Sequence, residues 1–266
     1  MHDLPPSPSG RANPDRRRPP RLLGIGFDDL STAEVRQRFD QWLAADSFRL
    51  VVTPNPEMLL SSESDERLER AIRSADLVLP DGFGLVRMAR VLGQRIRHRV
   101  PGVRAAELLL EIAALRGAPV YLLGARPGVA QAAAARLQQK FRALRVVGTD
   151  DGGVMDDPER PPAMAIDRIR EAAPAVLLVA LGHGKQERLL AAQRRALPSV
   201  RVAIGVGGAF DYWANRVRRA PRFLQRAGLE WLYRLGQQPS RLPRIIRAVI
   251  VFPCRAMADA FTHAHR

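Results

Sequence analysis

An aspartate in the segment Pro80-Asp81-Gly82 has the setting that a catalytic base requires. It follows the apolar run ADLVLP and precedes a stretch with helical periodicity. A partly desolvated carboxylate at the end of a strand could accept a proton from a hydroxyl nucleophile. The same aspartate could equally serve as the N-cap of the next helix, a common role for this residue type. The residues themselves leave both roles of Asp81 open.

Other chemically informative residues also follow predicted strands, in segments rich in glycine. These segments are Thr53-Pro54-Asn55, residues 124–128, residues 182–187 and residues 205–211. Glycine lets backbone N–H groups approach a phosphate, and the N-terminus of a following helix favours an anion. Each glycine alone is typical of a tight turn. Their recurrence at successive strand ends favours a nucleotide site.

Several common nucleotide and metal motifs do not occur in the chain. LGARPG at 123–128 lacks the GxGxxG spacing, and Gly184-Lys185 is followed by Gln186, so a dinucleotide oxidoreductase and a P-loop ATPase are disfavoured. The sequence has no DxD triplet, and its five histidines show no metal-ligand spacing. We therefore predict no metal site and no cofactor.

The elements that must position these residues alternate along the chain. Short apolar strands are expected at 48–53, 75–82, 119–124, 144–148, 175–182 and 200–208, with helices between them, including one long helix at 57–74. Such alternation is typical of an α/β fold with a Rossmann-like parallel sheet and helices on both faces.

The chain is expected to have three parts: a disordered leader at 1–21, an α/β catalytic domain at 22–211 and a helical C-terminal appendage at 212–266. The 266 residues carry a net charge of +15, and residues 212–266 hold 11 arginines against two acidic residues. Within 241–262 an apolar stripe lies among arginines, and Pro253 is expected to kink or end that helix. Such a helix could lie at a membrane interface or pack on the domain. A single cysteine excludes an internal disulfide framework.

Together the strand-end segments resemble the bacterial WecG/TagA/CpsF glycosyltransferase family. The resemblance covers residues 22–247, and any one motif alone would be weak. The matching stretches are TPNPEML at 53–59, ADLVLPDGFGLV at 75–86, RVPG at 99–102, VYLLGARPGVA at 120–130, LGHGKQE at 181–187, VGGAFDYWAN at 206–215 and RRAPRFLQRAGLEWLYRLGQQPSRLPR at 218–244.

The resemblance implies an inverting, metal-independent transferase that moves a sugar from a UDP-sugar to a polyprenyl-diphosphate-linked sugar, for surface polysaccharide or teichoic acid. It implies that Asp81 is the general base and that Thr53 lies in the same pocket. It also implies that the appendage supplies Arg234, Arg241 and Arg244 to the leaving diphosphate and docks on an anionic membrane surface. The enzyme would then be peripheral at the inner face of the cell membrane.

The expected substrate-binding residues combine the strand-end set with these arginines. From the strand ends they are Asn55, Gly124, Lys185, Gln186, Glu187, Gly207, Gly208 and Asp211. The chain departs from the family pattern where His183-Gly184 precede Lys185, since a proline is usual there. Two rival functions are a basic nucleic-acid-binding protein and an inactive relative that binds sugar nucleotides. The strand-end set favours the transferase, so no nucleic acid partner is expected.

Overall fold

The centre of the molecule is a six-stranded sheet. The computed structural model describes residues 19–217, 220–221, 223–224, 228–237, 239 and 242–264. The strand order is β4-β3-β8-β7-β5-β6, and every neighbouring pair is parallel. The strands are β3 (Arg49–Val52), β4 (Leu77–Val78), β5 (Val120–Gly124), β6 (Val146–Asp150), β7 (Val176–Ala180) and β8 (Val202–Gly205). The expected α/β architecture is confirmed.

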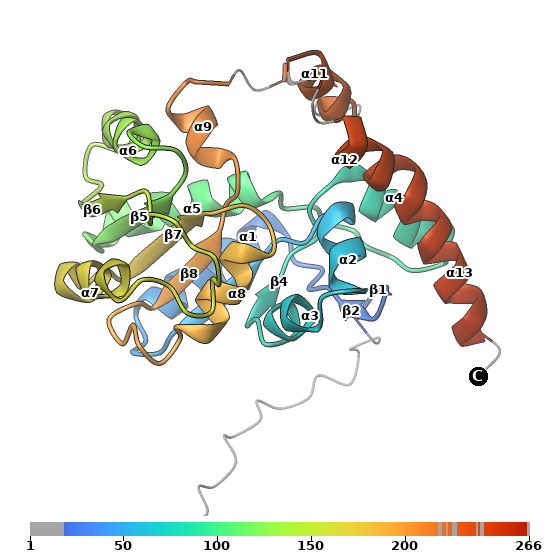
Figure 1. Ribbon diagram of the computed structural model, residues 1–266, viewed down its shortest axis with the longest axis horizontal. Helices are drawn as coiled ribbons and strands as arrows, with labels where there is room; N and C mark the ends of the chain where they lie inside the picture. The colour runs from blue at the N-terminus through green and yellow to red at the C-terminus, as the bar shows by residue number, and fades with distance from the viewer. Residues whose placement is uncertain are drawn as a thin grey trace, which may run out of the picture.

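Helices cover both faces of this sheet, and Figure 1 shows it between the two layers. One layer contains α1 (Thr32–Leu43), α5 (Gly102–Arg116), α6 (Val129–Lys140) and α9 (Ala209–Trp213). The other contains α2 (Pro56–Ser62), α3 (Glu66–Arg73), α4 (Phe83–Val91), α7 (Ala163–Ala172) and α8 (Lys185–Ala192). Successive strand residues serve opposite layers, as Val51 packs in the first and Val52 in the second. Because both faces of the sheet are covered by helices, the strands consist mostly of apolar residues.

Local capping decides where several helices begin. Ser31 and Glu34 form the capping box that starts α1. The prediction of one helix over 57–74 was wrong, because Asp65 accepts hydrogen bonds from the N–H groups of Arg67 and Leu68 and so begins a separate helix. A short hairpin, β1 (Arg21–Leu22) with β2 (Ile25–Gly26), was not expected. Of the expected leader, residues 1–18 lie outside the described part, and Arg21 already belongs to β1.

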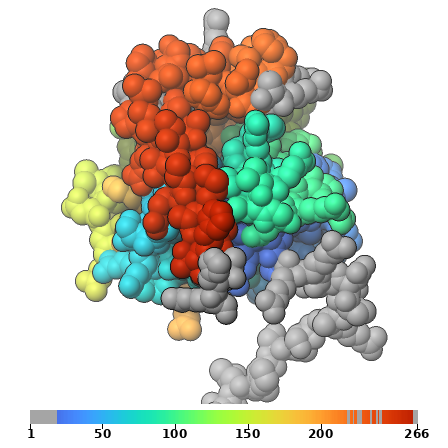
Figure 2. Space-filling view, turned by 90° about the vertical axis from the view of Figure 1, so that its right-hand side faces the viewer, coloured from blue at the N-terminus to red at the C-terminus, as the bar shows by residue number. Residues whose placement is uncertain are grey.

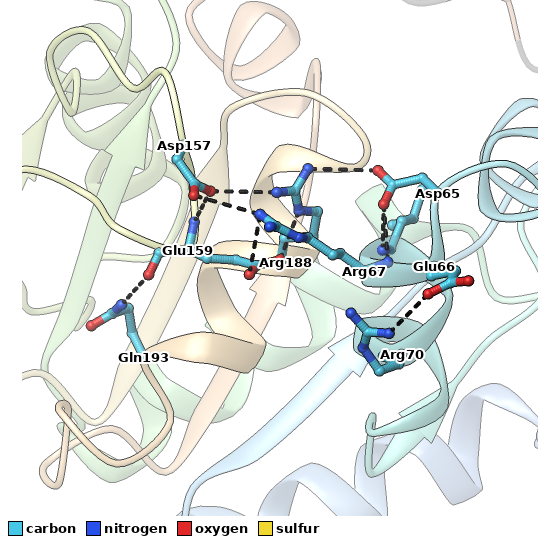
Figure 3. A network of polar contacts seen from close by, with 9 residues as sticks. Asp65, Glu66, Arg67, Arg70, Asp157, Glu159, Arg188 and Gln193 are labelled. Atoms are coloured by element: carbon cyan, nitrogen blue, oxygen red, sulfur yellow. Dashed lines mark hydrogen bonds and ion pairs between the residues drawn. The ribbon is translucent and has the colours of Figure 1, made fainter.

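A network of ion pairs ties the loop after β6 to α3 and α8 (Figure 3). The Arg188 guanidinium lies 3.0 Å from Glu159, 3.4 Å from Asp157 and 3.6 Å from Asp65. Arg67 reaches the first two of these carboxylates, at 3.7 and 3.6 Å. Through Arg188 the network holds the first turns of α8, which begins inside the expected ligand segment 182–187.

The C-terminal helices lie along the edge of the domain where α2 and α4 lie (Figure 1). They are α11 (Glu230–Gln237), α12 (Leu242–Ile246), the π-helical turn Arg247–Val251 and α13 (Phe252–Ala264). Phe252 and Ala256 are buried in the core that α2 and α4 share. Arg255 pairs with Glu63 at 2.7 Å.

The expectation that Pro253 ends the C-terminal helix was wrong, because α13 continues past it to Ala264. The π-helical turn ends at Val251, and α13 begins directly after it with Pro253 as its second residue. A proline within a helical path removes one backbone hydrogen bond, and a π-helical turn is the kind of local irregularity that accompanies such a loss. In Figure 2 the C-terminal helices lie across one face, between the part of the chain that contains α2 and the part that contains α4.

Candidate active site

The sheet topology opens a crevice at the carboxyl ends of β3 and β8. The chain leaves β3 toward α2 in one helical layer and leaves β8 toward α9 in the other. Where neighbouring strands connect to opposite faces, a crevice forms outside their carboxyl ends, and ligands bind there in open α/β sheets. A cavity of about 920 Å³ occupies this place. Thr53 and Asn55 line it from one side of the crevice, and the Gly205–Gly208 loop lines it from the other.

Thr53 and Asp81 meet in this cavity beside the start of α5. The backbone N–H of Gly102 donates to Asp81 Oδ2 at 3.1 Å. A Cβ atom on Gly102 would lie 2.5 Å from Thr53 Oγ1 and 3.6 Å from Asp81 Oδ2, so the first turn of α5 approaches both side chains closely. The backbone N–H of Asp81 donates to the Pro54 carbonyl at 3.0 Å, which ties the ends of β3 and β4 together.

The structure excludes one of the two roles that the sequence left open for Asp81. The N-cap position of α4 is Gly82, and no side chain caps that helix. Asp81 is therefore not the cap of α4, and its carboxylate, partly buried, faces the cavity. The interpretation of Asp81 as a helix cap was wrong.

The surroundings of Asp81 raise the pKa of its carboxyl group. Burial is the largest cause, and the nearby charge of Glu230 acts in the same direction. The Gly102 N–H and the positive charge of Arg99 oppose this shift. A carboxylate with a raised pKa is a stronger base than an ordinary aspartate, which suits proton abstraction from a hydroxyl group.

Gln186 connects two of the predicted strand-end segments. Its Oε1 accepts from the backbone N–H of Gly207 at 3.1 Å, and its Nε2 donates to Glu187 Oε1 at 2.7 Å. The side chain also explains the glycine at 205, because a Cβ there would lie 2.5 Å from Gln186 Nε2. Gln186, Gly207 and Gly208, which were expected to bind substrate, all line the cavity.

Among the described residues, three arginines line the cavity: Arg87 of α4, Arg99 before α5 and Arg244 of α12. Arg244 Nε lies 3.3 Å from Glu57 Oε1, and His183 Nε2 lies 3.7 Å from the same oxygen. Burial lowers the pKa of His183, with Glu57 opposing and Arg244 adding to the shift. Glu57 thus holds an appendage arginine at the rim of the cavity.

Some predicted residues do not reach the cavity. Lys185 Nζ donates to the Met155 carbonyl at 3.2 Å. Gly124, Glu187 and Asp211 do not line the cavity either. Glu187 is buried, and a Cβ on Gly124 would lie 2.8 Å from the Ala180 backbone. Asn55 lines the cavity and also caps α2 by accepting from the Met58 N–H at 2.9 Å. Arg241 and the side chain of Arg234 lie outside the described residues.

Sequence reasoning did not select Arg87, Arg99 and Glu230 as site residues. Arg99 opens the RVPG stretch and Glu230 lies in GLEWLYR, so both were within recognised motifs, whereas no pattern marked Arg87. Among the described residues, no group of three or more His, Cys, Asp or Glu side chains could hold a metal ion. The arginines are the cations that the described cavity offers to an anionic ligand.

Comparison with known proteins relates the chain to one protein family. The model of the "Glycosyl transferase WecG/TagA/CpsF family" matches residues 20–266. A relative from Bacillus spizizenii (strain ATCC 23059 / NRRL B-14472 / W23) is 34% identical over 229 residues, covering 84% of this chain and 87% of that protein. A relative from Bacillus subtilis (strain 168) is 31% identical over 197 residues, covering 74% and 75%. Each is named N-acetylglucosaminyldiphosphoundecaprenol N-acetyl-beta-D-mannosaminyltransferase.

Proposed function

The chain belongs to the WecG/TagA/CpsF family of glycosyl transferases, and from this premise we propose that it transfers an N-acetylhexosamine from a UDP-sugar to a polyprenyl-diphosphate-linked sugar. The named relatives act on an N-acetylglucosaminyl diphosphoundecaprenol. An acceptor of that chemistry joins a sugar hydroxyl, a diphosphate and a long apolar chain. The product would enter a cell-surface polymer such as teichoic acid.

The observation that carries the proposal is the Asp81 carboxylate beside Thr53 in the crevice cavity. In the proposed reaction the acceptor hydroxyl oxygen bonds to the anomeric carbon of the donor as the bond from that carbon to the UDP oxygen breaks. Asp81 takes the hydroxyl proton. A single displacement of this kind inverts the anomeric centre, and it requires only one base. The raised pKa of Asp81 supports this role.

The leaving diphosphate gains negative charge as its bond to the sugar breaks, and cations must stabilise that charge. Arg87, Arg99 and Arg244 line the same cavity as Asp81. Guanidinium groups bind phosphate oxygens with two parallel hydrogen bonds, which suits this task. We therefore include metal independence in the proposal, with arginines in the place that a divalent cation takes in other transferases.

We also propose that the enzyme works at the inner face of the cell membrane, docked through its C-terminal appendage. None of the helices in the described part of the chain has the length and apolar character of a membrane span. The appendage exposes large apolar side chains, including Trp231, Ile250 and Phe261. Exposed apolar residues beside arginines suit the surface of an anionic bilayer.

A transfer assay tests the proposal. Purified full-length chain is mixed with an N-acetylglucosaminyl diphosphopolyprenol in detergent and with a panel of UDP-sugars, in the presence of EDTA. We expect UDP release that depends on the acceptor and on one UDP-N-acetylhexosamine. NMR of the product should show an inverted anomeric centre. Activity lost in EDTA and restored by magnesium or manganese would contradict metal independence, and no transfer with any donor would contradict the proposed function.

A further inference from the structure

The cavity beyond Asp81 changes from polar to apolar between α4 and the C-terminal helices. Its inner end is lined by Thr53, Asp81 and the Gly205–Gly208 loop. Its outer walls are lined by Met88 and Val91 of α4 and, opposite them, by Ile245, Val249, Pro253 and Met257. We refer to this part, defined by those six residues, as the apolar groove.

Each wall of the apolar groove is a continuous stripe on a helix. Met88 and Val91 are three residues apart in α4, and the four residues of the opposite wall are spaced by four. Residues at these spacings lie on one helical face. From Ile245 to Met257 the stripe runs through α12, the π-helical turn and α13, and its length is at most the roughly 18 Å of twelve α-helical steps. Figure 2 shows the C-terminal helices next to the part of the chain that contains α4.

Three of the six side chains of the groove are left exposed by the described parts of the chain. Val91 is 66% exposed, Val249 is 45% exposed and Met257 is 39% exposed. These values are high for apolar residues that line a cavity, and they indicate a surface that an apolar ligand would cover. No acidic residue is among the six that form it.

Both walls start next to cationic residues at the polar end. On α4, Gly82 and Phe83 follow Asp81, and Arg87 lies directly before Met88. On the opposite wall, Arg244 precedes Ile245 and is held by Glu57 at the start of α2. Moving outward, the cavity thus presents a carboxylate, then guanidinium groups, then an apolar surface. A sugar hydroxyl, a diphosphate and a hydrocarbon chain follow one another in the same order in a polyprenyl-diphosphate-linked sugar.

We propose that the apolar groove binds the isoprenoid units of the acceptor that lie next to its diphosphate. The inference rests on the proposed function and adds a binding site to it. The enzyme would then select the lipid of its acceptor by direct contact, in addition to docking on the membrane in which that lipid lies. A long polyprenyl chain should be a better substrate than a short alkyl chain even in detergent, where no bilayer is present.

The test compares two acceptors in detergent micelles, one with a polyprenyl chain and one with a short alkyl chain, on the full-length enzyme. Val91→Asp and Met257→Asp place a charge in each wall. We expect either variant to lower the ratio of long-chain to short-chain kcat/KM about tenfold, with the KM for the UDP-sugar little changed. The matched controls Leu115→Asp and Met164→Asp carry the same charge on exposed apolar sites of α5 and α7, and they should leave the ratio unchanged.

Val91→Trp distinguishes binding of the acceptor chain in the groove from a nonspecific contact of the surface with lipid. Tryptophan keeps the surface apolar, so it would preserve or strengthen a contact with a bilayer or micelle, but it fills the groove. We expect Val91→Trp to lower the ratio as Val91→Asp does. If the unaltered enzyme transfers sugar but Val91→Trp leaves the ratio unchanged, the inference is overturned. The same holds if all the groove variants leave the ratio unchanged. Absence of transfer by the unaltered enzyme would overturn the proposed function and the inference with it.

Discussion

At the scale of single residues, the side chain of Asp81 is held in place by contacts that an asparagine would keep. The Gly102 N–H donates to Oδ2, and the carboxylate has no capping duty in α4. Removing the ability of residue 81 to accept a proton therefore need not disturb the structure around it. A substitution by asparagine therefore tests the chemical role of Asp81 without changing how its side chain packs.

We predict that Asp81→Asn lowers kcat by about 100-fold or more, the scale of a lost general base. Binding of UDP, measured by thermal shift, should remain. Because the pKa of Asp81 is raised and the base acts in its charged form, the activity of the unaltered enzyme should increase as the pH rises through that pKa. Asp46→Asn, at an exposed carboxylate, is the control. Near-normal turnover of Asp81→Asn would contradict the assignment.

A second carboxyl group, Glu187, is buried behind the cavity. Its oxygens accept from the Gly184 N–H and from Gln186 Nε2, each at 2.7 Å. Burial raises its pKa to about 7. The folded protein thus keeps a proton on Glu187 between pH 4.5 and about 7, whereas the unfolded chain releases it. The contribution of Glu187 to the free energy of unfolding is fully present below pH 4.5 and is lost as the pH rises toward 7.

We predict that Glu187→Gln reduces this pH dependence. In the unaltered protein the free energy of unfolding should fall by roughly 1 kcal/mol per pH unit between pH 5 and 7 on account of this group. Urea titrations across that range, compared with the variant, measure the difference. Glu171→Gln makes the same change at an exposed position and should follow the unaltered protein. Parallel curves for Glu187→Gln and the unaltered protein would contradict the shift.

At the scale of elements, two ion pairs attach the C-terminal helices to the region of α2. Arg244 pairs with Glu57, which belongs to α2, and Arg255 of α13 pairs with Glu63, which follows it. Both arginines are more than half exposed, so neither pair adds much stability. They differ in one respect, because Arg244 lines the cavity and Arg255 does not. The two sites therefore make a matched pair.

We predict that Arg244→Ala lowers kcat/KM by about tenfold or more, because a cation next to the leaving diphosphate is lost. Arg255→Ala should change kcat/KM by less than about twofold, since exposed pairs contribute little. Steady-state kinetics and thermal unfolding of both variants measure the effects. Equal losses in the two variants would indicate that both arginines act only by attaching the appendage.

At the scale of the whole molecule, the charge and the apolar surface gather in the same part of the chain. Residues 212–266 carry 11 of the chain's arginines and two acidic residues. Of the described apolar side chains that are large and exposed, most belong to this part. The expected boundary after Asp211 falls inside α9, whose Phe210 and Trp213 pack in the core, so a truncation should end after Asn215.

We predict that the full-length chain binds anionic vesicles and that the chain truncated after Asn215 binds them much more weakly. Binding should weaken between 0.1 and 1 M salt, as the Debye length falls from about 10 Å to about 3 Å. Sedimentation with vesicles measures both effects, and zwitterionic vesicles are the control. Equal binding of the two chains would place the membrane contact elsewhere. Circular dichroism checks that the truncated chain remains folded.

The sequence by itself determined the features that depend on near neighbours. The apolar strands, the capping box of Ser31 and Glu34 and the glycines at strand ends are local patterns, and they were enough to predict a parallel α/β sheet with ligand residues at one edge. The reason is that hydrogen bonds within a turn and the period of a strand involve residues only a few positions apart.

Only the tertiary structure decided which strand ends meet and where their side chains point. β3 pairs with β8, more than 140 residues later, and this pairing brings Thr53 to the Gly205–Gly208 loop. Gly102 approaches Thr53 and Asp81 from another helix, while Lys185 and Glu187 turn away from the cavity although Gln186 between them faces it. Such choices depend on how elements distant in the sequence pack against one another, because a side chain occupies the space that its neighbours leave.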